Sequence, residues 1–314
     1  MNTLWKNSRL GLFQKLGPLM GLGVIVIALS FISGDFLTVT NIFNVLRQIS
    51  INALLAFGMT FVILTGGIDL SVGSILALSG ALCAGMIAGG TDPILAVLAG
   101  LAAGTLMGAA NGLLVAKGRV APFIATLATM TIYRGLTLVY TEGRPITFSN
   151  ETFSLLGKGY FLEIPVPVIW MLLSFLILSF LLRNTTFGRH IYAVGGNEEA
   201  AVLSGIRADR VKIRVYAISG LFASLAGIIL TSRLSSAQPT AGVAYELDAI
   251  AAVVLGGTSL AGGRGWIAGT LVGAMIIGVL DNGLNLLNVS SFYQQVVKGG
   301  VILLAVLLDR SRNG

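Results

Sequence analysis

Three charged residues lie inside long apolar stretches of this sequence, namely Arg134, Asp281 and Lys298. A charge inside a bilayer is costly, so such side chains turn away from lipid, pair with one another or extend to the membrane surface. Arg134 and Asp281 would lie roughly 21 Å and 22 Å from the starts of their helices at 1.5 Å per residue. The matching depths predict an Arg134–Asp281 ion pair in the outer half of the membrane. We expect Lys298 to extend outward instead.

A second group of functional residues lies in the segment GGNEEAAVLSGI (195–206), inside the long hydrophilic loop 183–214. Gly195 and Gly196 predict a turn, Asn197 is a good helix N-cap, and two glutamates follow in the first turn, where a helix favours anions. Gly205 is a natural stop. We therefore predict a short, capped helix on the cytoplasmic side. A role in docking to a partner explains such a helix better than the alternative, a loop whose charges only set the orientation of the chain in the membrane.

Hydroxyl groups recur at helical spacing in the range 121–140, at Thr126, Thr129, Tyr133 and Thr137. Such groups suit a path for a neutral polyol that must pass without being held tightly. Threonines also form hydrogen bonds between membrane helices, and we favour that role for Thr126 and Thr129. For Tyr133 both interpretations stay open, and Thr137 is a candidate for the path together with Tyr133 and Arg134.

Two polar segments between helices hold further candidates. Asp69 and Ser71 lie in a glycine-framed turn that we place on the cytoplasmic side, where capping of the next helix is favoured over a gating role. The range 233–248 is longer than a simple connection requires and enters a helix through Tyr245 and Glu246. This segment forms either the outer mouth of a path or a packed cap. We keep Tyr245 and Glu246 as candidate residues for the path.

The elements that must position these residues follow from composition. Of 314 residues, 33 are charged, which is 11%, while 55% are hydrophobic and the mean hydropathy is +0.90. Soluble domains carry about 25% charged residues. Forty-one glycines without a three-residue period and seven prolines exclude collagen and low-complexity disorder. The chain is therefore predicted to be an all-α polytopic membrane protein.

Ten apolar ranges are long enough to be considered as membrane crossings: 17–33, 48–65, 70–90, 93–116, 121–140, 164–182, 215–232, 247–262, 266–287 and 293–308. The first is expected to be a retained helix rather than a signal peptide. The eighth is short enough to be re-entrant. With ten crossings and both termini inside, fourteen of the 20 basic residues are cytoplasmic and four are outside. The positive-inside rule favours that arrangement. It also explains the net charge of +7 without nucleic-acid binding.

Small residues and weak internal similarity describe how these helices are expected to pack. Glycines recur every fourth position at 100, 104, 108 and 112, and again at 265, 269 and 273, which permits close helix contact within the chain or between chains. GGIDLSVG (66–73) resembles GGTSLAGG (256–263), and Asn111-Gly112-Leu113 resembles Asn282-Gly283-Leu284. An inverted repeat of five plus five helices within one domain, 1–314, is a hypothesis from these matches.

Several kinds of chemistry have no motif in the sequence. There is no phosphate loop of the form G-x-x-x-x-G-K-[ST], no G-x-S-x-G and no H-E-x-x-H, and the only histidine is His190. We therefore expect no catalysis, no cofactor and no metal site. A transporter, a pore or a scaffold remains.

Long ordered motifs resemble one known family. Besides 195–206, they are VILTGGIDLSVGS (62–74), AKGRVAPFIATLATM (116–130), RLSSAQPTAGVAYELDAIAAVVLGGTSLAGGRG (233–265) and DNGLNLL (281–287). Together they are similar to permease subunits of bacterial ABC sugar importers of the ribose/xylose/galactoside group. Within that group the pattern is most similar to permeases for ribose.

The resemblance implies a ten-helix fold like that of type II ABC importers, in the bacterial inner membrane. It implies a second permease subunit, ABC ATPase subunits that bind ATP and Mg²⁺, and a periplasmic sugar-binding protein. The substrate would be ribose or a similar monosaccharide, with xylose, galactose or an autoinducer-type furanose as alternatives. A stand-alone secondary transporter or channel is the rival class. The residues implied in ATPase coupling are Gly195, Gly196, Asn197, Glu198, Glu199, Ala200, Ser204 and Gly205.

Overall fold

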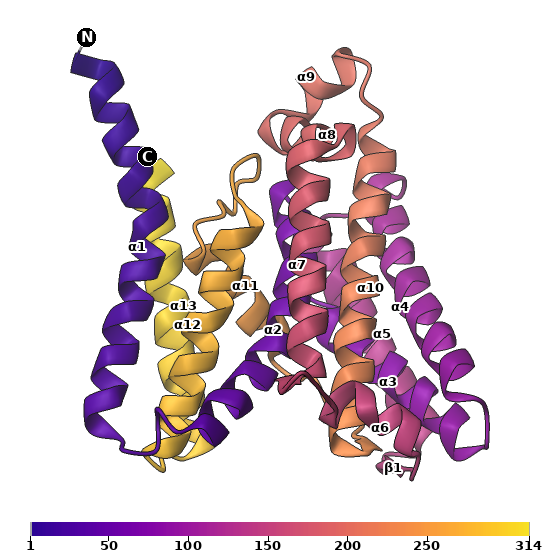
Figure 1. The fold of residues 1–314 in the computed structure, drawn as a ribbon. Coiled ribbons are helices and arrows are strands. Elements are labelled where there is room, and N and C mark those ends of the chain that lie inside the picture. Colours follow the sequence, from indigo (N-terminus) through magenta and orange to yellow (C-terminus); the bar gives the residue numbers. More distant parts are fainter. Residues whose placement is uncertain (1, 314) are drawn as a thin grey trace.

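The chain folds into a bundle of helices with four two-residue strands (Figure 1). The computed structural model describes residues 2–313, and the side chains of residues 17–304, 306 and 307. The helices are α1 (Asn2–Ile32), α2 (Val39–Leu64), α3 (Val72–Ala88), α4 (Pro93–Ala116), α5 (Pro122–Thr141), α6 (Glu151–Lys158), α7 (Val166–Asn184), α8 (Thr186–Gly196), α9 (Glu198–Leu203), α10 (Ala208–Leu234), α11 (Tyr245–Leu255), α12 (Ile267–Leu286) and α13 (Ser291–Asn313). Strand β1 (Ile146–Thr147) pairs with β4 (Ser236–Ala237), and β2 (Tyr160–Phe161) pairs with β3 (Ile164–Pro165), both antiparallel.

Within the described residues, six helices are long and apolar enough to cross a membrane: α2, α4, α5, α7, α10 and α12. Two shorter apolar helices, Gly17–Ile32 and Val72–Ala88, accompany them. An all-α polytopic membrane protein is thereby confirmed. The expected crossing 247–262 is helical only as far as Leu255. Beyond it Gly257, Gly262 and Gly263 have positive φ, which a continuing helix excludes.

Helices α2 and α10 form the centre of the bundle. Every residue of α2 from Ile49 to Leu64 is buried. Helix α2 packs against α10, α11 and α12, while α10 packs against α2, α3 and α4. Helix α3 also contacts α4 and α5, just as α11 contacts α12 and α13. The two halves of the chain therefore use corresponding contacts around a shared central pair.

The glycine stripes are packing faces within the chain. A Cβ at Gly108 or Gly112 would overlap the α10 backbone at Tyr216 or Ile213. On α12, a Cβ at Gly269 would overlap the carbonyl of Gly256 just after α11, and one at Gly273 would overlap the carbonyl of Ala252 in α11. Backbones this close gain dispersion contact that larger side chains would prevent. Gly265 belongs to the turn before α12 and is not part of the helical stripe.

Two of the apolar segments are helical over only part of their length. Helix α3 follows the irregular segment 65–71, and α11 follows the irregular segment 238–244. The two helices begin beside each other, because a Cβ at Gly73 would overlap the carbonyl oxygen of Gly242 and one at Gly242 would meet the backbone of Gly73. Residues 65–73 and 238–244, which lead into α3 and α11, are called the broken segments below. Such interrupted helices are tolerated in membranes where protein or a cavity surrounds the freed backbone groups.

Candidate functional site

Arg134 of α5 binds both broken segments. Its Nη1 donates hydrogen bonds to the carbonyl oxygens of Pro239 and Ala241, both at 2.8 Å, and its Nη2 donates a longer one of 3.5 Å to Gly73. Residues 239 and 241 precede α11 and have no helical partner for these carbonyls, so a fork of guanidinium donors satisfies them. The sequence does not reveal carbonyl partners, because they depend on where helices are interrupted.

The predicted Arg134–Asp281 pair is wrong. Asp281 Oδ2 lies 2.9 Å from Lys298 Nζ, which also lies 3.0 Å from Asp248 Oδ2. Depth along a helix does not specify which neighbour the residue faces, and α5 packs on α3 while α12 packs on α11. The expectation that Lys298 extends outward is also wrong, since this side chain ties α13 to α11 and α12.

A cavity of about 360 Å³ opens beside Arg134. It is called the α5 cavity below, and its lining includes Ser74, Thr131, Arg134, Val243 and Glu246. Helices α3, α5 and α11 all contribute to its wall. Of the predicted path residues, only Arg134 and Glu246 line this cavity.

The other predicted path residues lie elsewhere. Tyr133 donates a 3.1 Å hydrogen bond to the Met107 carbonyl of α4, and Thr137 donates one of 2.8 Å to Tyr133 within its own helix. Both side chains are buried. Thr126 donates to the Ile68 carbonyl of the irregular segment before α3 as well as to its own helix, so it joins two elements but does not bond helix to helix. Thr129 bonds only within its helix, to Thr126.

Asp69 joins the broken segment before α3 to helix α10. Its Oδ1 accepts hydrogen bonds from the backbone N–H and the hydroxyl of Ser71, and its Oδ2 accepts one of 2.9 Å from Ser219 of α10. Ser71 in turn accepts from Asn111 of α4. Ser219 is eleven residues into α10, about 17 Å along the helix from Ala208, so Asp69 lies inside the bundle rather than at the end where α10 begins. It bonds the cap residue Ser71 rather than a first-turn amide of α3.

A second, polar cavity of about 440 Å³ surrounds the Lys298 ion pairs and is called the α13 cavity below. Tyr245 lines this cavity rather than the α5 cavity. Arg233 and Asn285 also contribute to its wall. The sequence located Tyr245 and Glu246 in one candidate path, but they face different cavities.

The short capped helix is confirmed as α9. The side chain of Asn197 accepts a 2.9 Å hydrogen bond from the backbone N–H of Ala200, and Gly205 has φ +86° just after the helix. Ala200 also accepts from the hydroxyl of Ser204 at its carbonyl. Gly195 and Gly196 end α8 instead of forming a turn. Glu199 and most neighbours are exposed, including the apolar side chains of Val202 and Leu203, which are 52% and 89% exposed.

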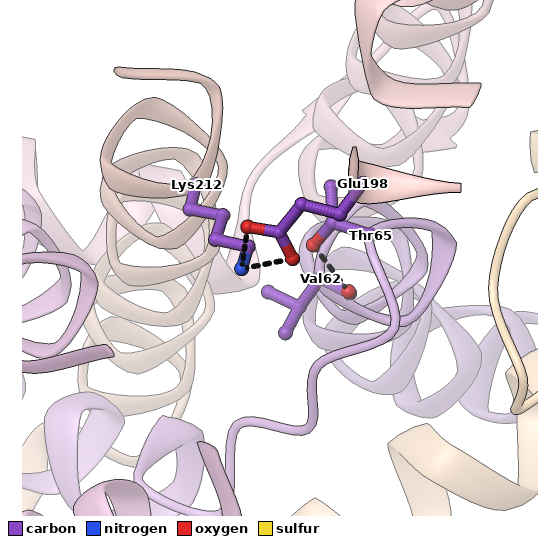
Figure 2. A network of polar contacts seen from close by, with 4 residues as sticks. All are labelled: Val62, Thr65, Glu198 and Lys212. Carbon is purple, nitrogen blue, oxygen red and sulfur yellow. Dashed lines mark hydrogen bonds and ion pairs between the residues drawn. The ribbon is translucent and has the colours of Figure 1, made fainter. Parts of the chain in front are cut away.

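One ion pair holds α9 against α10. Lys212 Nζ lies 2.7 Å from both carboxylate oxygens of Glu198 (Figure 2). The Glu198 side chain is 47% exposed, so this contact lies at the surface of the protein. Glu198 therefore has a partner within its own chain.

The end of α8 packs directly on two glycine turns. Together these residues (64–67, 195–196 and 262–265) are called the cytoplasmic junction, after the orientation proposed below. A Cβ at Gly195 would overlap the carbonyl oxygen of Leu64, which also accepts a 3.0 Å hydrogen bond from Gly263 N–H. Tyr192 of α8 donates a 2.8 Å hydrogen bond to the Gly265 carbonyl. The turn 64–67 continues into the segment before α3, and the turn 262–265 follows α11. The sequence similarity between 66–73 and 256–263 is the one feature that could have indicated that these two turns meet at α8.

Residues 41–306 match the family described as the permease component of branched-chain amino acid transport systems. The chain belongs to this family, which confirms the resemblance to permease subunits. The same residues carry the two broken segments and the cytoplasmic junction.

Curated relatives cover nearly the whole chain. It is 66% identical over 305 residues to the ribose import permease protein RbsC of Bacillus subtilis, covering 96% of this chain and 95% of that protein. It is 56% identical to the RbsC of Escherichia coli K12, covering 94% and 93%. It is 44% identical to the D-allose transport system permease protein AlsC of the same organism, covering 95% and 92%. No solved structure matches the chain.

Proposed function

We propose that this chain is the membrane-spanning subunit of an ATP-driven importer for ribose or a similar monosaccharide. The observation that supports ribose as the substrate is the 66% identity to a ribose import permease over 95% of its length. Identities are lower to permeases for D-allose, at 44%, and for L-arabinose, at 41%. Ribose is therefore favoured over those sugars and over xylose, galactose and autoinducer-type furanoses.

The proposed topology has ten crossings, with both termini in the cytoplasm of a bacterial inner-membrane protein. The start of α1 and the end of α13 lie toward the same end of the bundle as α8 and α9, with α6 and β1 at the opposite end, which supports this orientation (Figure 1). Segments 65–88 and 235–255 would each cross as an irregular stretch followed by a short helix. Similar packing in the two halves supports a five-plus-five inverted repeat. In that repeat α2 would correspond to α10, α3 to α11, α4 to α12 and α5 to α13.

The chain would act as one transport domain with partners in three places. A second copy would complete the path, ABC ATPase subunits would dock on α9 and a sugar-binding protein would dock outside. The exposed Leu203 beside charged residues supports docking on α9, since large apolar side chains exposed to water mark interaction surfaces. ATP and Mg²⁺ would bind to the ATPase subunits, and this chain would perform no catalysis and hold no cofactor.

The coupling mechanism follows from the cytoplasmic junction. A displacement of α9 and α8 by the ATPase would act on the turns 64–67 and 262–265, since Gly195 packs against the first and Tyr192 bonds the second. The first turn leads to α3 and the second is joined to α11. The entry points of these two helices meet at Arg134 beside the α5 cavity. A movement at the cytoplasmic surface would thereby change the wall of that cavity.

Uptake by purified complexes in vesicles tests this proposal. With the ATPase and the binding protein present, labelled ribose should accumulate only when ATP is supplied. Accumulation without the ATPase subunit, driven by an ion gradient, would instead support a stand-alone secondary transporter. Competition by unlabelled xylose, galactose, allose and arabinose would rank the sugars, and a preference for another sugar over ribose would overturn the substrate assignment.

A further inference from the structure

The α13 cavity combines a large volume with polar walls. Helices α2, α10, α11, α12 and α13 all contribute side chains to it. Its volume of about 440 Å³ lies in the range of about 300–1,000 Å³ that is typical of small-molecule sites. Asn285 and Gln294 lie near the ends of α12 and α13 that the proposed topology places outside, and Gln48 lies about 14 Å into α2 from the same side.

Buried polar atoms in this cavity have hydrogen-bonding capacity that the protein does not use. Asn52 is only 6% exposed, and its side chain makes no hydrogen bond to any residue that the structure describes. Asp281 is 3% exposed, and its Oδ1 also has no partner among those residues, but this oxygen is closed off from the cavity. Buried polar groups are almost always paired, so the unpaired amide of Asn52, which lines the cavity, indicates a polar occupant.

The charges that line the cavity disfavour a ligand with a net charge. Two cations, Arg233 and Lys298, face two anions, Asp248 and Asp281, so the lining is electrically balanced. An anion would meet the two carboxylates and a cation would meet the two basic groups. A neutral molecule with many hydroxyl groups suits such a lining, since each hydroxyl both donates and accepts hydrogen bonds.

We propose that the α13 cavity binds a neutral polyol, specifically a monosaccharide such as ribose, inside each copy of the chain. The proposal rests on the proposed function and extends it by placing a sugar site within one subunit. The Asn52 amide would donate hydrogen bonds to sugar hydroxyls and accept hydrogen bonds from them, and the ring of Tyr245 would offer an apolar face.

The first turn of α11 separates this site from the α5 cavity. Tyr245 and Asp248 line the α13 cavity, while Glu246 lines the α5 cavity. Lys298 holds this turn from one side through Asp248, and Arg134 holds the residues just before it from the other. A sugar in the α13 cavity would therefore contact the same helical turn that forms the wall of the α5 cavity.

The test uses protection of an introduced cysteine in the complete complex in vesicles. The native Cys83 is fully buried, so Gln48→Cys supplies an accessible thiol in the α13 cavity. Its reaction with a water-soluble methanethiosulfonate is timed with ribose and with glycine betaine at equal osmolality. We expect labelling to be about tenfold slower at ribose ten times above its dissociation constant, and betaine to have no effect. The matched control, Thr131→Cys in the α5 cavity, should keep its labelling rate.

A second variant links protection to the proposed contacts. Adding Asn52→Leu to Gln48→Cys removes an amide that has no described partner to lose. It should weaken the protecting effect of ribose about tenfold or more, because sugar hydroxyls are left unpaired. Unchanged labelling of Gln48→Cys with ribose, or equal slowing at both cysteines, would overturn the sugar site. Absence of ATP-driven ribose uptake by the unmodified complex would instead overturn the proposed function.

Discussion

Arg134 and Lys298 are both basic residues within apolar helices, and the two are stabilised in different ways. Arg134 donates hydrogen bonds to backbone carbonyls of the broken segments. Lys298 pairs with two carboxylates from α11 and α12. Both side chains hold the start of α11, from opposite sides. The first is a cation bound to neutral groups, and the second belongs to a network of three charges.

Because the two residues are stabilised differently, we expect their removal to have different consequences. Removing Lys298 leaves two carboxylates buried without a cation, which is a problem of stability throughout the bundle. Removing Arg134 leaves carbonyl oxygens unpaired where two segments meet, which is a problem of local geometry. We therefore expect Lys298 to matter most for folding and Arg134 to matter most for transport.

The largest expected effect is that of Lys298→Met. Breaking a buried ion pair by removing one partner costs about 3–5 kcal/mol, so this variant should lose most of its folded protein in thermal-stability assays in detergent. The matched control replaces all three charges, as Asp248→Asn, Asp281→Asn and Lys298→Met. It should recover much of the stability because no unpaired charge remains. Equal instability of the triple variant would show that the packing of these side chains matters rather than their charge.

The next effect is that of Arg134→Gln. Hydrogen bonds from a charged donor contribute about 1.5–3 kcal/mol, and the shorter, uncharged side chain of glutamine cannot replace the two short ones. We expect a folded, assembled complex whose ribose uptake falls about tenfold or more. The exchange Arg134→Asp with Asp281→Arg should not restore uptake, since these residues are not partners. Full rescue by that exchange would contradict the geometry described for α5.

The smallest effect concerns the exposed Glu198–Lys212 pair. Surface ion pairs contribute about 0–1 kcal/mol, so Glu198→Lys should hardly change thermal stability. It should reduce ATP-driven uptake, because α9 loses its attachment to α10. Exchanging the charges, as Glu198→Lys with Lys212→Glu, should restore uptake if Glu198 acts through Lys212. Persistently low uptake in the exchanged variant would mean that the ATPase recognises the Glu198 charge itself.

The sequence predicts the fold well where a pattern is local. Hydropathy located the apolar helices, and Asn197 with Gly205 correctly bounded a six-residue helix. It failed at the eighth crossing, because whether Gly257 and Gly263 extend or end a helix depends on backbone contacts with other turns. The glycines of α4 identified a packing face, and only the structure shows that α10 covers it.

The candidate site was predicted less completely, since partners come from distant elements. Arg134 and Asp281 were correctly singled out as intramembrane charges and incorrectly paired, because equal depth does not define the facing helix. Glu246 and Tyr245 are adjacent in sequence and line different cavities, since successive residues on a helix point about 100° apart. The junction around Gly195 was missed because its partners are backbone atoms of two remote turns.

Two adjacent glycines test the coupling through the cytoplasmic junction most directly. A Cβ at Gly195 would overlap the Leu64 carbonyl, whereas one at Gly196 would meet nothing within 4 Å. The measurement is ATP-driven ribose uptake by reconstituted complexes of Gly195→Ala and Gly196→Ala, each checked for assembly with the ATPase. We predict that Gly195→Ala assembles but hydrolyses ATP with little uptake, while Gly196→Ala transports normally. Normal uptake by an assembled Gly195→Ala complex would contradict coupling through the junction.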